Sequence, residues 1–197
     1  MRGMRSAMAE KNIIEQQRWF FRRKRIPYPL DECYKREKRK LPRVTEIVSS
    51  KIPKPYKSLL VHNHDMTSTL EKFHGGRIHL SMLRNWQEND FYFREVALTL
   101  DENERRVEFG AIKINLRPFQ PEARQKILDA KLPLGRILSD YNVAYHSNPR
   151  FFFTIEADEL IQSALQLSSD ATLYGRQNTL STLNGETLAE IVEILPP

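Results

Sequence analysis

The sequence is poor in cysteine and has no long apolar segment. Its 197 residues include a single cysteine, Cys33, and 7 glycines. One cysteine cannot form an intramolecular disulfide, and no run approaches the roughly 18 apolar residues that a membrane helix needs. No apolar leader core precedes a small-residue cleavage site either. We therefore expect no transmembrane segment and a reducing compartment, with the cytoplasm as the expected location.

The positive charge is concentrated at one end of the chain. Residues 1–57 hold 17 Lys and Arg against 6 Asp and Glu, a local charge of +11. Residues 58–197 hold 14 against 19, a local charge of −5. The length fits one domain of about 140 residues plus an extension. We therefore divide the chain into a basic N-terminal extension and linker, 1–57, and a domain, 58–197.

The extension permits two interpretations. WFFRRKR (19–25) sets aromatic side chains beside cations, a pattern typical of proteins that bind single-stranded nucleic acid. An amphipathic helix with a solvated basic face, lying on the domain or on a second subunit, explains the same pattern. Its apolar side would carry Ile13, Ile14, Phe20 and Phe21. We favour the helix and keep binding to nucleic acid or to an anionic surface as the alternative.

Within the domain, the patterns predict a mixture of helices and strands. Apolar residues at helical spacing predict a helix over 59–74, ended by Gly75-Gly76. Segments 91–100 and 106–116 are rich in β-branched and aromatic residues and predict an antiparallel hairpin. Helices at 121–130 and after Pro133 follow. Three further strands are expected in RFFFTIEA, LYGRQNTLSTL and ETLAEIVEIL, the last two joined at Asn184-Gly185. The class is α+β with an antiparallel sheet.

Three histidines and an aspartate near the start of the domain raise the question of a metal site. They are His62, His64, Asp65 and His74. On a helix, residues four apart share a face, whereas His62 and His64 are two apart. A third ligand at a suitable spacing is missing. We therefore expect no metal, and attention moves to the neighbouring Met66 and Thr67.

Arg94 is a charge in an otherwise apolar row. Alternate residues of a strand share a face, so Arg94 points the same way as Val96 and Leu98. A buried guanidinium needs a partner, and its planar fork suits a carboxylate. The candidate partners are Glu95, Glu190 and Glu193 of the chain, or the carboxylate of a ligand. The sequence leaves these alternatives open.

A second feature that suits an anion is LPLGRIL (132–138). Pro133 fits the first turn of a helix, which leaves the backbone N–H groups of Leu134, Gly135 and Arg136 free to face an anion. On the last strand, Glu190 and Glu193 lie on opposite faces by the period of two, so one of them should point inward.

These segments resemble the chorismate lyase (chorismate pyruvate-lyase) family. The motifs are DMTSTLEKF, REVAL, PLGRIL and LYGRQNTLSTLNGETLAEIVEILP, in the family's order, over about 70% of the chain from residue 59 to the end. The resemblance implies a six-stranded antiparallel sheet with helices packed on one side, around an internal pocket. It implies a carbon–oxygen lyase that converts chorismate to 4-hydroxybenzoate and pyruvate without a metal or organic cofactor. Such an acid would feed quinone biosynthesis or another aromatic pathway.

The resemblance also implies roles for individual residues. Arg94 would match the arginine that grips the ring carboxylate, and Glu193 would match the acidic residue near the distal oxygen. From the chemistry of the substrate, we expect Glu193 to assist proton movement or to polarise the ring hydroxyl. The substrate-binding residues would be Met66, Thr67, Leu134, Gly135, Arg136 and Arg176. Chorismate is a dianion, so cations and backbone donors suit it.

One departure from the family leaves further readings open. Some members carry Gly-Arg where this chain has Gly110-Ala111, and Lys113 is then the nearest cation. Either Arg136 or Arg176 substitutes, or the pocket accepts a different aromatic acid. The same architecture serves in certain transcription regulators as a module that binds a small aromatic acid without transforming it. That module and nucleic-acid binding by the N-terminus are the alternatives to the lyase. Oligomeric state stays open.

Overall fold

The computed structural model describes residues 26–197 and shows an α+β fold built on a seven-stranded antiparallel sheet. The strand order is β1-β5-β6-β7-β4-β3-β2. The strands are β1 (Val44–Ile47), β2 (Ile78–Glu88), β3 (Phe91–Leu100), β4 (Arg106–Asn115), β5 (Tyr145–Glu156), β6 (Thr172–Thr182) and β7 (Thr187–Leu195). The helices are α2 (Leu30–Arg36), α3 (Tyr56–Leu60), α4 (Met66–His74), α5 (Pro121–Leu128), α6 (Leu134–Asp140) and α7 (Glu159–Leu165), with a 3-10 turn at Ser49–Lys51. The predicted α+β class with an antiparallel sheet is confirmed, with seven strands in place of six.

The additional strand comes from the segment that the sequence assigns to the linker. β1 pairs with β5 at the edge of the sheet, with Val44 opposite Ile155. Upstream of it, α2 buries Cys33 and Tyr34 against the sheet. Residues 26–57 therefore pack on the domain, while WFFRRKR (19–25) and the helix predicted around it lie outside the described residues.

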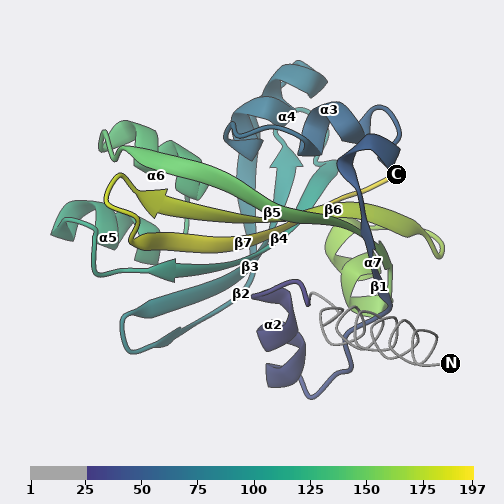
Figure 1. Cartoon of the computed structure of the whole chain (residues 1–197), viewed down its shortest axis with the longest axis horizontal. Coiled ribbons are helices and arrows are strands. Elements are labelled where there is room, and N and C mark those ends of the chain that lie inside the picture. The colour runs from purple at the N-terminus through teal and green to yellow at the C-terminus, as the bar shows by residue number, and fades with distance from the viewer. Residues whose placement is uncertain (1–25) are drawn as a thin grey trace, which may run out of the picture.

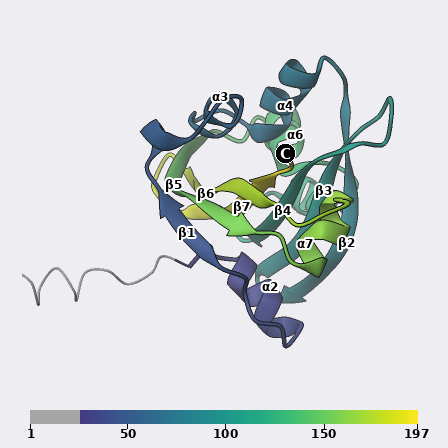
Figure 2. The ribbon, with the colours of Figure 1, turned by 90° about the vertical axis from the view of Figure 1, so that its right-hand side faces the viewer.

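Helices lie over both faces of the sheet (Figures 1 and 2). α3 and α4 lie together over one end of the first face, and α5 and α6 lie together over the other end of that face (Figure 1). On the opposite face, α2 and α7 cover a second apolar layer that includes Phe109, Phe153 and Ile194. No helix within residues 26–197 is long and apolar enough to cross a membrane.

The helix expected over 59–74 is two helices, α3 and α4, separated by a short loop. Asp65 begins α4, because its carboxylate accepts a hydrogen bond of 2.8 Å from the Ser68 N–H. Gly75 ends it in the left-handed conformation, with a φ of 69°. The break matters because it lets Asp65 and Met66 turn over the first face of the sheet.

The predicted hairpin is present as β3 and β4, and the turn at Gly185 joins β6 to β7. Sequence analysis did not identify β2, which pairs with β3 along its whole length, or α7. Helices α5 and α6 begin at or beside the prolines that were expected to begin them.

Gly175 on β6 lets Phe153 and the backbone of Glu193 approach more closely than any side chain at residue 175 would permit. A Cβ there would lie 2.6 Å from Phe153 Cζ and 2.8 Å from the backbone oxygen of Glu193. We expect Gly175→Ala to lower the free energy of unfolding by about 1–3 kcal/mol through overpacking. Gly76→Ala is the matched control, because its Cβ would make an ordinary 3.6 Å contact with Leu100. Equal denaturation midpoints for the two variants would contradict this packing.

Candidate functional site: a buried cavity on the first face of the sheet

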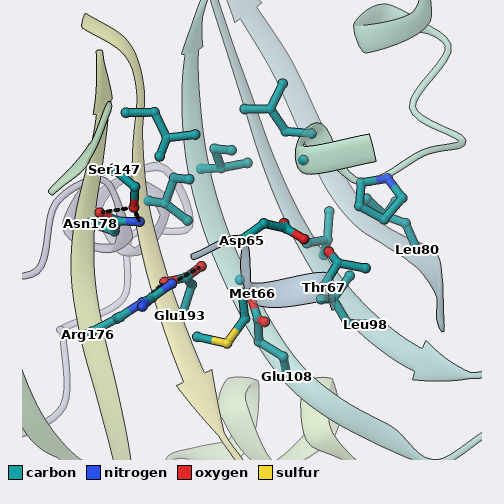
Figure 3. A pocket seen from close by; sticks show the side chains of 18 of the residues that line it. Asp65, Met66, Thr67, Leu80, Leu98, Glu108, Ser147, Arg176, Asn178 and Glu193 are labelled. Carbon is teal, nitrogen blue, oxygen red and sulfur yellow. Dashed lines mark hydrogen bonds and ion pairs between the residues drawn. The ribbon is translucent and has the colours of Figure 1, made fainter. Parts of the chain in front are cut away.

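A narrow cavity lies between the first face of the sheet and the α4 and α6 helices (Figure 3). It has about 610 Å³ of empty space including its mouth. Its floor comes from alternate residues of β3 and β4, and its roof includes Met66, Thr67, Leu134 and Gly135. These dimensions suit a small or slender molecule.

Arg94 of β3 is a buried cation in the cavity wall. Arg94 is 2% exposed, and its Nε has no hydrogen-bond partner among the described residues. Its Nη1 donates a long hydrogen bond, 3.4 Å, to the carbonyl of Leu132. Burial lowers the pKa of Arg94 to about 10, so the guanidinium is still charged at neutral pH.

The carboxylates considered as partners of Arg94 face other cations. The observed partners are Arg84 for Glu95, Lys113 for Glu190 and Arg176 for Glu193. Lys113 belongs to the opposite face of β4 from the cavity, as does Ala111, which packs in the second apolar layer. The alternative in which Arg94 is neutralised by one of these glutamates is therefore wrong.

Arg176 and Glu193 form a buried ion pair between β6 and β7 (Figure 3). They are directly opposite in the register, and Arg176 Nη2 lies 3.3 Å from Glu193 Oε1. Arg176 Nη1 also donates to the carbonyls of Leu60 and His62, at 3.1 and 2.9 Å. Both side chains line the cavity, but their charges satisfy each other, so the pair is part of the wall's framework.

Glu108 of β4 is a buried carboxyl group without a cation of its own. The residue is 4% exposed, and its Oε2 has no hydrogen-bond partner within residues 26–197. Burial, and next the charge of Glu193, raise the pKa of Glu108 well above its usual range. The cavity therefore contains two polar groups that the described protein atoms leave unsatisfied, Arg94 and Glu108.

Asp65 also lines the cavity and lies beside Met66 (Figure 3). A Cβ on Gly135 would lie 2.1 Å from Asp65 Oδ1, so the absence of a side chain at residue 135 lets the carboxylate approach α6. On the opposite wall, Asn178 donates a 3.0 Å hydrogen bond to the hydroxyl of Ser147. Beside them, burial raises the pKa of Tyr145.

The structure brings most of the predicted site residues together. Those that line the cavity are Met66, Thr67, Arg94, Leu134, Gly135, Arg176 and Glu193. Arg136 is not among them and is exposed on α6. Sequence reasoning missed Glu108, although the rule that singled out Arg94 applies to it. Glu108 is a charge in an apolar strand segment, on the same face as Gly110 and Ile112.

The histidines are engaged in contacts within the protein. His62 Nε2 lies 2.7 Å from the carbonyl of Leu59, and burial together with Arg176 lowers the pKa of His62. His74 Nδ1 accepts a 2.8 Å hydrogen bond from Arg105. Within residues 26–197, no group of three or more His, Cys, Asp and Glu side chains is placed to hold one metal ion.

The Glu108 carboxyl should make stability depend on pH. Because its folded-state pKa is raised, the folded state favours the protonated form, and stability falls as pH rises above the ordinary carboxyl pKa. We expect Glu108→Gln to equal the parent at acid pH and to be increasingly more stable than it toward alkaline pH. Thermal midpoints of both proteins across that range test this. A difference in thermal midpoint that is the same at every pH would mean that the substitution acts through packing and not through protonation of Glu108.

No family model and no curated protein matches this sequence. The fold is similar to that of PhnF from Mycobacterium smegmatis, with a TM-score of 0.54 and 12% identity over 69% of this chain and 65% of that one. The chain thus spans just under two thirds of that protein's length. A separate structure of the effector domain of PhnF matches with a TM-score of 0.53 and 12% identity, over 69% of this chain and 90% of the domain. A GntR-family transcriptional regulator from Enterococcus faecalis is more distant, with a TM-score of 0.42 and 8% identity over 59% of this chain and 91% of that one.

These matches correct the assignment to the chorismate lyase family. Of the structures that share the fold, the one matched over 90% of its own length is described as an effector domain and not as a lyase. The predicted lyase activity, its substrate chorismate, its products 4-hydroxybenzoate and pyruvate, and the link to quinone biosynthesis are therefore wrong. REVAL lies on β3 and PLGRIL begins α6, so these motifs reflect a shared fold. Glu193, expected to move a proton, is instead ion-paired with Arg176.

Proposed function

We propose that this domain binds a small anionic molecule in the cavity and releases it unchanged. The observation that carries the proposal is Arg94, a buried and charged guanidinium whose Nε lacks a partner in the described chain. An unpaired buried charge costs several kcal/mol, so a protein retains one where a bound group compensates it. A carboxylate or phosphate fits the planar fork of a guanidinium with two parallel hydrogen bonds.

The remaining lining residues support a binding role. Met66 and Thr67 form part of the roof, and Leu134 and Gly135 begin α6 beside Leu132, the contact of Arg94. We propose these four residues as ligand contacts, with Arg94 as the anion-binding group. Arg176 and Glu193 would hold the wall rather than the ligand, because each already satisfies the other.

The fold is consistent with this function. One of the solved structures to which the chain is similar is described as the effector domain of PhnF, a name that fits a domain with a ligand cavity. We keep the division into an extension, 1–57, and a domain, 58–197, as a proposal, with the described part of the extension, 26–57, packed on the domain. We also keep a cytoplasmic location as part of the proposal, because the single cysteine cannot form an intramolecular disulfide.

Calorimetric titration with small carboxylates and with inorganic phosphate tests the proposal. The panel includes benzoate, hydroxybenzoate and straight-chain acids. We expect at least one anion to bind the parent, and Arg94→Gln to abolish that binding. Arg136→Gln is the matched control, since Arg136 is exposed and outside the cavity. Equal loss in both variants, or no loss in Arg94→Gln, would contradict the proposal.

A further inference from the structure

We infer that the ligand has two charged ends, an anionic group bound by Arg94 and a primary amine bound by Glu108. This inference rests on the proposed function and specifies the class of ligand more closely. The class is a slender amino acid whose amine and carboxylate are at opposite ends of a short chain. Anion binding by Arg94 does not require a second charge on the ligand, so anion binding and amine binding can be tested separately.

The two unsatisfied groups lie at separate positions along the floor of the cavity. Arg94 is opposite Ile112 in the register of β3 and β4, and Glu108 is opposite Leu98. Four residues therefore separate the two positions along the strands, about 13 Å between Cα atoms at roughly 3.3 Å per residue. A linear molecule that lies along the strands can contact both groups.

The floor of the cavity between Arg94 and Glu108 is apolar, and it has no side chain on β4. Val96 lies between them on β3, and Gly110 faces it on β4. A Cβ at Gly110 would lie 3.2 Å from Glu108 Oε1, so the carboxyl group extends over the glycine, toward the Arg94 end. This shortens the distance that a ligand must span, and the Val96 side chain offers contact to methylene groups.

The charges near each end differ in sign. The negative charges of Glu193 and Asp65 act on the Glu108 carboxyl group, and the positive charge of Arg176 acts in the opposite direction. The neighbouring titratable group that acts on Arg94 is the hydroxyl of Tyr92, which is neutral at physiological pH. A cation is therefore favoured at the Glu108 end and an anion at the Arg94 end.

The protonation of Glu108 distinguishes an amine from a neutral ligand group. In the free protein, burial favours the protonated carboxyl group, as the raised pKa of Glu108 indicates. An ammonium group needs the carboxylate, so its binding releases the proton of Glu108 to the solvent. A hydroxyl or carbonyl group can accept a hydrogen bond from the protonated form, and no proton leaves. The other titratable or charged side chains that line the cavity are His64, Asp65, Arg94, Tyr145, Arg176 and Glu193.

The test uses three matched series of probes with the full chain. These are linear acids from butanoate to octanoate, the same acids with a terminal hydroxyl group, and the same acids with a terminal amine. Calorimetry in buffers of different ionisation enthalpy gives both the affinity and the number of protons released. The proteins are the parent, Arg94→Gln, Glu108→Gln, and Glu122→Gln as a control on the exposed side of α5.

We expect one amino acid of the series to bind the parent about tenfold or more tightly than its unsubstituted counterpart, with a net release of protons that its counterpart does not show. Glu108→Gln should remove that preference and the proton release, whereas Glu122→Gln should keep both. If unsubstituted or hydroxy acids bind as tightly as the amino acids and still need Arg94, the amine site is wrong and the proposed function stands. If no probe of the three series binds, this inference fails, and the proposed function is decided by the titrations with benzoate, hydroxybenzoate and phosphate. If binding persists in Arg94→Gln, the proposed function fails and this inference fails with it.

Discussion

Arg94→Met should be more stable than the parent protein while losing its affinity for small anions. The substitution replaces an unpaired buried cation with a shorter apolar side chain of comparable volume, and the hydrogen bond that it removes is long, 3.4 Å to Leu132. Replacing buried charged groups by well-packed apolar ones is often stabilising. We expect the free energy of unfolding to rise by about 1–3 kcal/mol, with a melting midpoint higher by roughly 2–4 °C per kcal/mol.

The sign of this change separates a binding residue from a structural one. A structural arginine would leave an unpaired partner when removed, and the protein would lose stability. Denaturant unfolding of the parent, Arg94→Met and the exposed control Arg136→Met measures the difference. The control should stay within about 0.5 kcal/mol of the parent. A loss of more than about 1 kcal/mol in Arg94→Met alone would show that Arg94 is needed for the fold.

Arg176→Met should have the opposite effect and a large cost in stability. It leaves Glu193 as an uncompensated carboxylate at a position that is 4% exposed, and it removes the donor to the carbonyls of Leu60 and His62. Removing one partner of a buried ion pair costs about 3–5 kcal/mol. We therefore expect a loss of that size in denaturant unfolding, together with loosening of the loop between α3 and α4.

The double variant Arg176→Met/Glu193→Leu is the control for this second prediction. Removing both charges eliminates the uncompensated carboxylate, so the double variant should recover a large part of the stability lost in Arg176→Met. The unpaired carbonyls of Leu60 and His62 would remain as a smaller cost. Additive losses in the double variant would mean that Arg176 and Glu193 do not interact in the folded protein.

Much of the fold follows from local patterns, because each local signal agrees with the tertiary structure. The two-residue period of β3 places Arg94 in the cavity, and Gly75 ends α4 as expected. The strand β1 is only four residues long, and its pairing with β5 is not encoded in any alternating pattern. The break between α3 and α4 was hidden because apolar residues continue at helical spacing across it.

The chemistry of the site was harder to predict than its location. The pairing of Arg176 with Glu193 depends on the register between β6 and β7, which sequence periodicity does not give. Without that pairing, both residues resembled ligand-binding groups. Glu108 was within reach of the same reasoning that identified Arg94, because it is a charge on the cavity face of an apolar strand. Motifs such as PLGRIL indicated the fold correctly, but the lyase activity inferred from them was wrong.

The central claim is that the cavity binds a small anion through Arg94 without transforming it. The most direct measurement is nuclear magnetic resonance of the tightest-binding anion from the calorimetric panel, incubated with the parent protein and with Arg94→Gln. We expect line broadening with the parent, none with Arg94→Gln, and full recovery of the intact molecule after prolonged incubation. New product signals with the parent would contradict the non-catalytic role, and equal broadening with Arg94→Gln would contradict the role of Arg94.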